Sequence, residues 1–245
     1  MVSRRMGFFC YLRRVGPSLA LLLLLGGCAA VGRVAQLDDG WYHVAHLGGN
    51  DSLAARLQQV PHHYVYVQQR TDTLLLSPYT TQPQPTTYRY ELQSNHHALL
   101  YSRSFDVDVF TLPVKARLPR EGVPVQLNTT FSAAVYVGRR TDYYYLHKHT
   151  LAPWQHEPRI RATGLGYGLF FGMGSTNVTN DVTRQHTGPE YEGFVLHAGL
   201  AAIYDARIFN VGVAAGADHL LGSDRATWIY QHQPWFGLLF GLDLN

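Results

Sequence analysis

The last third of the chain, residues 159–245, alternates large apolar residues with small or polar ones. Four stretches share this period of two: Ala162–Gly174, Tyr191–Tyr204, Ile208–His219 and Pro234–Asn245. Successive side chains of a β-strand point to opposite faces, so a period of two predicts strands. We therefore expect four late strands, each with one bulky face and one small face.

The small face of these strands is rich in glycine, which is a poor strand residue because it has no side chain to pack. The inner wall of a narrow closed barrel explains the repetition, since small residues fit inside while bulky residues face outward. In a lipid bilayer such an outward stripe is the required surface. A soluble barrel or sandwich, with its large residues inward, is the alternative. The bulky set includes Leu165, Tyr167, Leu169, Phe171, Met173, Phe194, Leu196, Phe236, Leu238 and Phe240.

The connections between the late strands differ in length. A tight turn, Asp205–Arg207, joins two strands, whereas Ser175–Glu190 and Leu220–Gln233 are long and polar. Outer-membrane barrels alternate short periplasmic turns with longer external loops. The pattern thus favours a periplasmic Asp205 turn and an external position for both long loops, where they could bind an external ligand or protein.

The rest of the chain also indicates an all-β fold, a small antiparallel up-and-down barrel of about eight strands. Asp51–Val60 predicts a short helix capped by Asp51 or Ser52, after an irregular tether at Ala29–Gly49. Asp106–Leu118 is extended but broken at Pro113. Turns are expected at Asn95–His97 and Arg139–Asp142. The remaining predicted strands are His63–Gln69, Asp72–Ser77, Thr87–Gln93, Ala98–Phe105, Gln126–Val137 and Tyr143–His149.

The first 27 residues have the features of an export signal. Four arginines precede the apolar run Leu19–Leu25, which is too short to span a bilayer. Leu25-Gly26-Gly27-Cys28 follows and resembles the lipobox of bacterial lipoproteins. The resemblance implies cleavage before Cys28, acylation of that residue and, with Ala29 after it, attachment to the outer membrane. The predicted organisation is a signal peptide at 1–27, a lipidated tether and short helix at 28–60, and a β-barrel domain at 61–245.

Cleavage would change the charge and the cysteine content of the chain. Met1–Gly27 carries four Arg and no acidic residue, so its removal turns 20 basic and 17 acidic residues into 16 and 17. No basic footprint for nucleic acid survives. Cys10 is lost with the signal and Cys28 would be acylated, which excludes a disulfide, a thiol nucleophile and a thiolate metal site in the mature chain.

The ending Trp235–Asn245 places Gly237, Phe240 and Leu242 in a Gly-x-x-apolar-x-apolar pattern. This pattern resembles the terminal strand by which outer-membrane barrels are recognised for assembly. The last half of the chain is similar to small uncharacterised barrels of Gram-negative envelopes. That resemblance implies an outer-membrane location and names no activity.

Thirteen histidines raise the question of a metal site. His147 and His149 share a strand face, but no acidic partner stands at ligand spacing beside them and no HExxH or CxxC motif occurs. A polar barrel rim, with Tyr143–Tyr145 and Trp154 as an interfacial aromatic girdle, accounts for these residues better. We expect no metal and no cofactor.

His197 is the strongest candidate for chemistry because it lies on the small face of a late strand. Outer-membrane lipid A deacylases carry His and Ser two residues apart on such a strand, with the His as general base. Gly199 occupies that second position here, so the resemblance does not extend to catalysis. His197, Asp218, Glu192 and Asp243 are therefore predicted as paired polar residues of the barrel interior.

Three functional hypotheses follow from the sequence. The first is a lipid-anchored outer-membrane barrel with a structural or binding role and no catalytic activity, in contact with outer-membrane lipid. The second is a soluble periplasmic lipoprotein barrel that binds an apolar small molecule, as lipocalins do. The third is an envelope enzyme that modifies lipid.

Overall fold

The computed structural model describes residues 33–34, 36–60, 64–80, 86–152, 155–184, 188–205 and 209–242. The predicted signal Met1–Gly27, the lipid-attachment residue Cys28, Trp154 and the candidate interior residue Asp243 lie outside these ranges. Among the described residues, no helix is both long enough and apolar enough to cross a bilayer.

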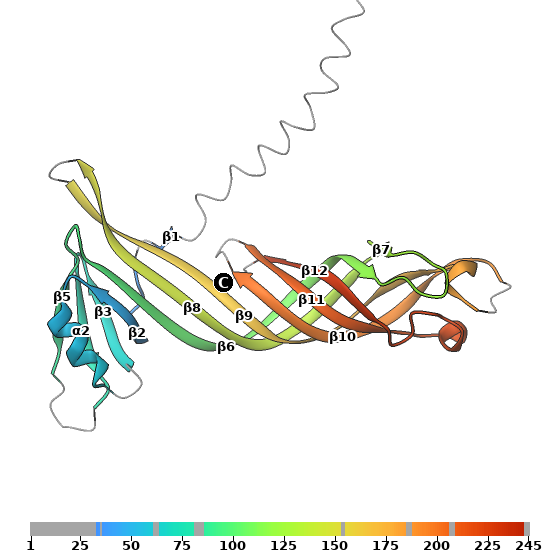
Figure 1. The fold of residues 1–245 in the computed structure, drawn as a ribbon, viewed down its shortest axis with the longest axis horizontal. Helices are drawn as coiled ribbons and strands as arrows, with labels where there is room; N and C mark the ends of the chain where they lie inside the picture. The colour runs from blue at the N-terminus through green and yellow to red at the C-terminus, as the bar shows by residue number, and fades with distance from the viewer. Residues whose placement is uncertain are drawn as a thin grey trace, which may run out of the picture.

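The described strands form one antiparallel sheet, and the molecule is elongated (Figure 1). The all-β, antiparallel prediction is confirmed, as is a single short α-helix near the N-terminal end of the described chain. The elements are β1 (Arg33–Val34), β2 (Gly40–Gly48), α2 (Asp51–Gln58), β3 (Tyr64–Arg70), β4 (Thr73–Pro78), β5 (Tyr88–Glu91), β6 (His97–Arg117), β7 (Gln126–Asn128), β8 (Ser132–Ala152), β9 (Gln155–Val178), η3 (Asn180–Val182), β10 (Tyr191–Asp205), β11 (Phe209–Leu220), η4 (Ser223–Ala226) and β12 (Pro234–Leu242).

Six strands pair in a ring in the order β6, β8, β9, β10, β11 and β12. The ring is completed where Trp235–Phe240 of β12 pairs with Thr111–Arg117 of β6. Only the later part of β6 and the facing parts of β8 and β9 belong to it. We call the end of this six-strand ring nearer the first elements the proximal end, and the other end the distal end.

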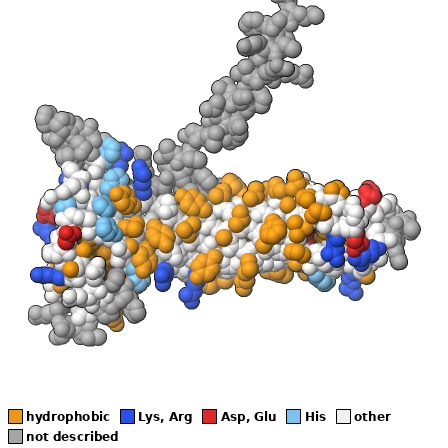
Figure 2. Space-filling model, viewed as in Figure 1, with side chains coloured by type: hydrophobic (Ala, Val, Ile, Leu, Met, Phe, Trp, Pro, Cys, Tyr) orange, Lys and Arg blue, Asp and Glu red, His pale blue; other side chains and the backbone are white. Residues whose placement is uncertain are grey.

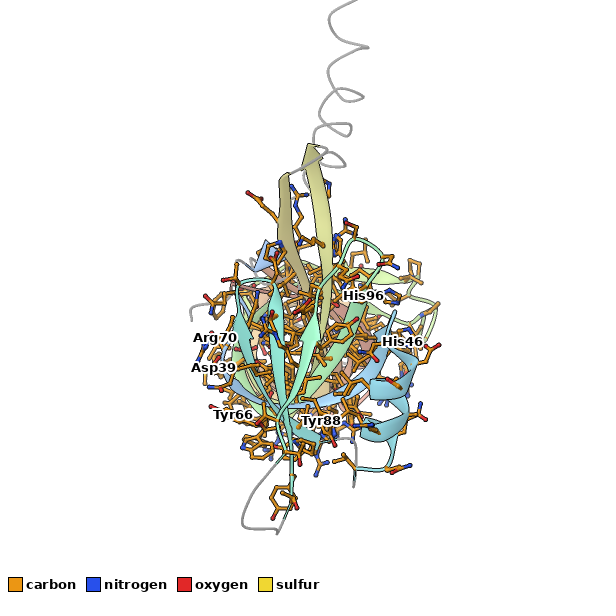
Figure 3. The ribbon with its side chains drawn as sticks, turned by 90° about the vertical axis from the view of Figure 1, so that its left-hand side faces the viewer. Asp39, His46, Tyr66, Arg70, Tyr88 and His96 are labelled. Atoms are coloured by element: carbon orange, nitrogen blue, oxygen red, sulfur yellow. The ribbon has the colours of Figure 1, made fainter. Side chains whose placement is uncertain are left out.

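The proximal halves of β6, β8 and β9 continue out of the ring into the remaining part of the sheet, which we call the N-terminal sheet. There β2 pairs with the start of β6, and β3, β4 and β5 follow in order. Leu53 and Leu57 of α2 pack into its core together with Leu74, Leu100 and other buried residues. Figure 3 looks onto this sheet: Arg70 and Asp39, which form an ion pair of 3.6 Å, lie on one side, and His46 lies on the other near α2.

Several sequence predictions need correction. Arg139–Asp142 is not a turn: it pairs with Ser102–Phe105 on one side and Gly164–Tyr167 on the other. The predicted strand Gln126–Val137 is divided between β7, Gln126–Asn128, and the start of β8, and β8 also contains the predicted strand Tyr143–His149. The ring has six strands where about eight were expected. Gly40–Gly48, assigned to the tether, is a strand held between β3 and β6. The helix cap is Asn50, whose side chain accepts from the Leu53 backbone N–H at 3.1 Å.

The bulky set that the alternation defined on the late strands faces outward, as predicted. Leu169 is 63% exposed, Phe171 59%, Leu200 63% and Phe236 55%. Figure 2 shows hydrophobic side chains spread along the visible face of the ring, and we call the exposed apolar side chains of the ring the belt. The opposite parity is buried, with Val195, His197 and Ile203 on β10 as examples.

Candidate functional site

A buried cluster of charged side chains lies in the ring interior near its distal end. Lys115 and Arg117 of β6 both donate to Asp218 of β11: Nζ of Lys115 lies 3.1 Å from Oδ1, and a terminal nitrogen of Arg117 lies 2.6 Å from Oδ2. Nδ1 of His197 on β10 accepts from Nζ of Lys115 at 3.1 Å. All four side chains are nearly inaccessible to solvent. We call them the interior charge cluster.

Aromatic rings and one hydroxyl complete the surroundings of the two cations. Nζ of Lys115 lies 4.7 Å from the ring centroid of Trp235, and the Arg117 guanidinium lies 5.0 Å from that of Trp228. Arg117 also donates to Oγ1 of Thr176 at 2.9 Å. Such cation–π contacts gain strength where water is excluded. The cluster therefore joins side chains from β6, β9, β10, β11 and β12.

A β-bulge on β6 directs the two cations inward. The β6–β12 register shifts between Leu238 and Phe240, which pair with Val114 and Thr111, so two residues of β6 oppose one of β12. Phe110 and Leu112 point inward before the bulge, and Lys115 and Arg117 do so after it. Strict alternation would have placed Val114 and Ala116 inside instead. Pro113 stands at the bulge, where its missing N–H costs no ladder bond.

Glycines make room for the cluster. A Cβ atom on Gly172 of β9 would lie 2.5 Å from Nε2 of His197 and 2.7 Å from Cα of Ala134. On Gly216 of β11 it would lie 2.8 Å from the Trp235 ring. The glycine face of the late strands is thus not an empty lining, because neighbouring strands insert large side chains over it.

The middle of the ring is filled by a hydrophobic cluster. Phe110, Tyr136, Phe170, Trp235 and Leu239 are all buried there, together with alanines and Ile203. Phe110 and Tyr136 meet edge to face, with ring centroids 5.8 Å apart. This packing leaves the two polar ends of the interior separated by an apolar plug.

A second ion-pair group lies at the proximal end of the ring. Arg140 of β8 pairs with Asp142 at 2.8 Å and with Asp205 at the end of β10. Both carboxylates are buried. These partners explain why the polar run that resembled a turn instead continues as strand: Arg140 is satisfied inside the ring.

The distal end is covered by described residues of the three long connections, 118–131, 179–184 with 188–190, and 221–233, which we call the distal cap. Trp228, Ile229 and Tyr230 are buried against Val182 and Val195. Polar contacts join the three segments: Arg184 pairs with Glu121, Arg120 donates to Gln233 at 2.7 Å, and the Ile229 N–H donates to the Val182 carbonyl at 3.0 Å. The cap is thus a folded unit within the described residues.

The predicted interior residues have different outcomes. His197 and Asp218 are both buried and are register partners on β10 and β11, but Lys115 lies between their polar atoms and bridges them. Glu192 is exposed and lies on the opposite face of β10 from His197, so its assignment to the interior is wrong. Its side chain has the parity of Phe194, which faces outward.

The histidines of the proximal region do not gather into a metal site in the described part of the chain. His147 is half-buried, and its pKa lies below the usual value because of burial, with Arg161, His149 and Arg159 adding to the shift. Tyr143 and Tyr145 face outward, whereas Tyr144 packs against the core of the N-terminal sheet.

The interior charge cluster links different strands of the ring through ion pairs and hydrogen bonds. Lys115 and Arg117 are each directed at acceptors on other strands, and Gly199, two residues from His197, offers no hydroxyl.

Comparison with protein-family profiles, curated protein sequences and solved structures finds no match to this chain.

Proposed function

We propose that this chain is a lipid-anchored outer-membrane protein whose six-strand ring spans the membrane as a small β-barrel. Its role is structural or binding: the barrel holds the distal cap at the outer surface and the N-terminal sheet in the periplasm. The observation that carries the proposal is the belt of exposed apolar side chains on the ring (Figure 2). A continuous apolar surface of this kind is a liability in water and the required surface in hydrocarbon.

The lengths of the strands support a crossing followed by an extension. A membrane strand needs about 9–11 residues, whereas β9 has 24 and β8 has 21. The remaining half of each strand projects beyond the belt and builds the N-terminal sheet (Figure 1). The belt on β9 runs from Leu165 to Met173, which matches one crossing.

The filled interior favours an anchor over the two other hypotheses. A lipocalin-like protein needs an internal cavity for its ligand, but Phe110, Tyr136 and Trp235 occupy the middle of this ring. A lipid-modifying enzyme needs a nucleophile beside its base, and His197 faces Lys115 and Gly172 instead. We therefore assign binding to the two ends of the molecule.

The orientation follows from the connections. Asp205, the last residue of β10 before the short connection to β11, lies at the proximal end, and the described residues of the distal cap lie at the other. Short turns on the periplasmic side and long loops outside are the rule for outer-membrane barrels. The same orientation puts the N-terminal sheet on the side of a lipid-anchored Cys28.

Membrane insertion can be tested with a charge placed in the belt. Leu169 lies in the middle of the belt on β9. Leu169→Arg should therefore destabilise the protein folded in bilayers by about 2–4 kcal/mol, the cost of an arginine at the bilayer midplane. Leu221→Arg, at an exposed leucine beyond the end of β11, is the matched control and should change little. Folding would be followed by the faster migration of the unboiled protein on SDS gels. A chain without residues 1–28 that stays monomeric in water without detergent would overturn the proposal.

The lipid anchor has a separate test. Cys28→Ala should abolish palmitate labelling and leave the precursor unprocessed. Ser3→Ala, in the same signal segment, should still be labelled. Labelling that persists in Cys28→Ala would remove the anchor from the proposal and leave the barrel untouched.

A further inference from the structure

Two outward-facing arginines stand at the proximal border of the apolar belt. In the register of the sheet Phe105 of β6 faces Arg139 of β8, and Arg139 faces Tyr167 of β9, so the three side chains form one row across adjacent strands. Arg103 lies two residues before Phe105 on β6 and shares its face. Figure 2 shows Lys and Arg side chains at this end of the belt.

These side chains line a groove on the outer surface with a volume of about 530 Å³, to which Ser104, Arg140 and Thr141 also contribute. Phe105 is 72% exposed and Tyr167 is 65% exposed, and both belong to the belt. The groove therefore places Arg139 between two aromatic side chains of the belt, with Arg103 on the side toward the N-terminal sheet.

The two arginines are free to meet an external anion. Neither forms an ion pair with a carboxylate of the described residues, whereas the inward-facing Arg140 beside them is paired twice. The guanidinium of Arg103 lies 5.4 Å from the ring centroid of Tyr101, which holds it against the sheet. Arg103 and Arg139 are diagonal neighbours on paired strands, a separation of roughly 7–8 Å between their backbones, so both can reach one anionic group.

We propose that this groove binds the phosphate group of an anionic lipid headgroup in the leaflet next to the N-terminal sheet. Arginine suits phosphate because its planar fork of donors matches the oxygens. Phe105 and Tyr167 would contact the upper part of the bound lipid on the proximal side of the belt, and its acyl chains would continue past Val107 and Leu169 toward the middle of the bilayer. The proposal rests on the membrane insertion proposed above.

The test measures lipid selectivity in the full mature lipoprotein. The protein is reconstituted in phosphatidylcholine bilayers, and the association of spin-labelled phosphatidylglycerol is compared with that of spin-labelled phosphatidylcholine. We expect a preference for phosphatidylglycerol that falls roughly fivefold for each arginine replaced in Arg103→Gln, Arg139→Gln and the double variant. The control is Arg56→Gln with Arg225→Gln, two exposed arginines far from the groove, which should keep the preference.

A further measurement distinguishes a lipid headgroup from a free phosphate ion as the ligand of the groove. Inorganic phosphate is exchanged for chloride at equal ionic strength. If it leaves the bound lipid in place, the headgroup is the ligand; if it displaces the labelled lipid, the groove is a site for free phosphate and the proposal is wrong. Equal association of the two lipids, or an unchanged preference in the double variant, also overturns it. Absence of any protein-restricted signal, even from phosphatidylcholine, would instead overturn membrane insertion itself.

Discussion

Nζ of Lys115 on β6 and Oδ1 of Asp218 on β11 lie 3.1 Å apart, although β12 separates their strands in the ring. The contact crosses the interior behind β12. It therefore fixes the position of a strand that neither residue belongs to, and it does so next to the one pairing that completes the ring.

Replacing Asp218 by Asn should strongly destabilise the protein. The substitution leaves Lys115 and Arg117 buried without a carboxylate, and breaking a buried pair in this way costs about 3–5 kcal/mol. Urea titration of the folded, unboiled gel band measures the change. The control is Asp181→Asn on η3, an exposed acid that should have little effect. Equal midpoints for the two variants would refute the structural role of the cluster.

Gly172→Ala should destabilise the ring, since the added Cβ would lie 2.5 Å from Nε2 of His197 and close to the β8 backbone. Overpacking of this kind costs roughly 1–3 kcal/mol. Gly40→Ala is the control, because its Cβ would find its nearest atom at 3.6 Å, on Tyr42. The temperature at which half of each variant converts to the slow-migrating gel band measures the stability of that variant. A neutral Gly172→Ala would contradict the tight packing of His197.

The N-terminal sheet should lose stability at high pH through Tyr90. Its buried hydroxyl donates to the carbonyls of Gly48 and His97, at 2.6 and 2.9 Å, and burial raises its pKa from 10.0 to about 12. The folded state favours the neutral phenol, so this contribution is complete below pH 10 and is lost as the pH rises toward 12.

The measurement compares the urea midpoint for unfolding of the N-terminal sheet at pH 9 and near pH 12. Unfolding is followed by circular dichroism. Tyr90→Phe should remove about 1 kcal/mol at pH 9 and should flatten the pH dependence. Tyr66→Phe, at a half-buried tyrosine on β3 of the same sheet, should keep the wild-type profile. A Tyr90→Phe profile as steep as the wild type would assign the pH effect to another group.

Trp228→Ala should open the distal cap without unfolding the ring. Trp228 is 2% exposed and contacts both Arg117 and Tyr230, and losing a buried Trp costs roughly 3–5 kcal/mol. We expect faster tryptic cleavage after Arg184 or Arg225, with the unboiled gel mobility retained. Trp228→Phe, which keeps a ring over Arg117, should be cleaved more slowly than the Ala variant. Unchanged cleavage would mean that the cap does not depend on this core.

The sequence indicated the late strands well because their alternation is strong. The outward direction of Leu169, Phe194 and Phe236 follows from a period of two, and the structure confirms it. The same signal failed at Arg139–Asp142, since four consecutive polar residues look like a turn. Arg140 pairs with Asp205, which is 65 residues further along the chain (205 − 140), and a local pattern cannot reveal such a partner.

The interior charge cluster was only half visible in the sequence. His197 and Asp218 stood on a recognisable small face, whereas Lys115 and Arg117 were hidden by the change of parity on β6. Pro113 was the available signal, because a proline within a strand marks a bulge or an edge. A bulge reverses which residues face inward for the rest of its strand, so one residue decides the chemistry of the interior.

The three strands shared by the ring and the N-terminal sheet have a mechanical consequence. β6, β8 and β9 pass from one to the other without a hinge, and their hydrogen bonds run unbroken from Asp142 to His147. A load applied to the N-terminal sheet would be transmitted along a stiff ribbon directly to the ring wall. The ring and the N-terminal sheet should therefore rotate and tilt together. Cutting the chain between them would break the three strands on which both depend.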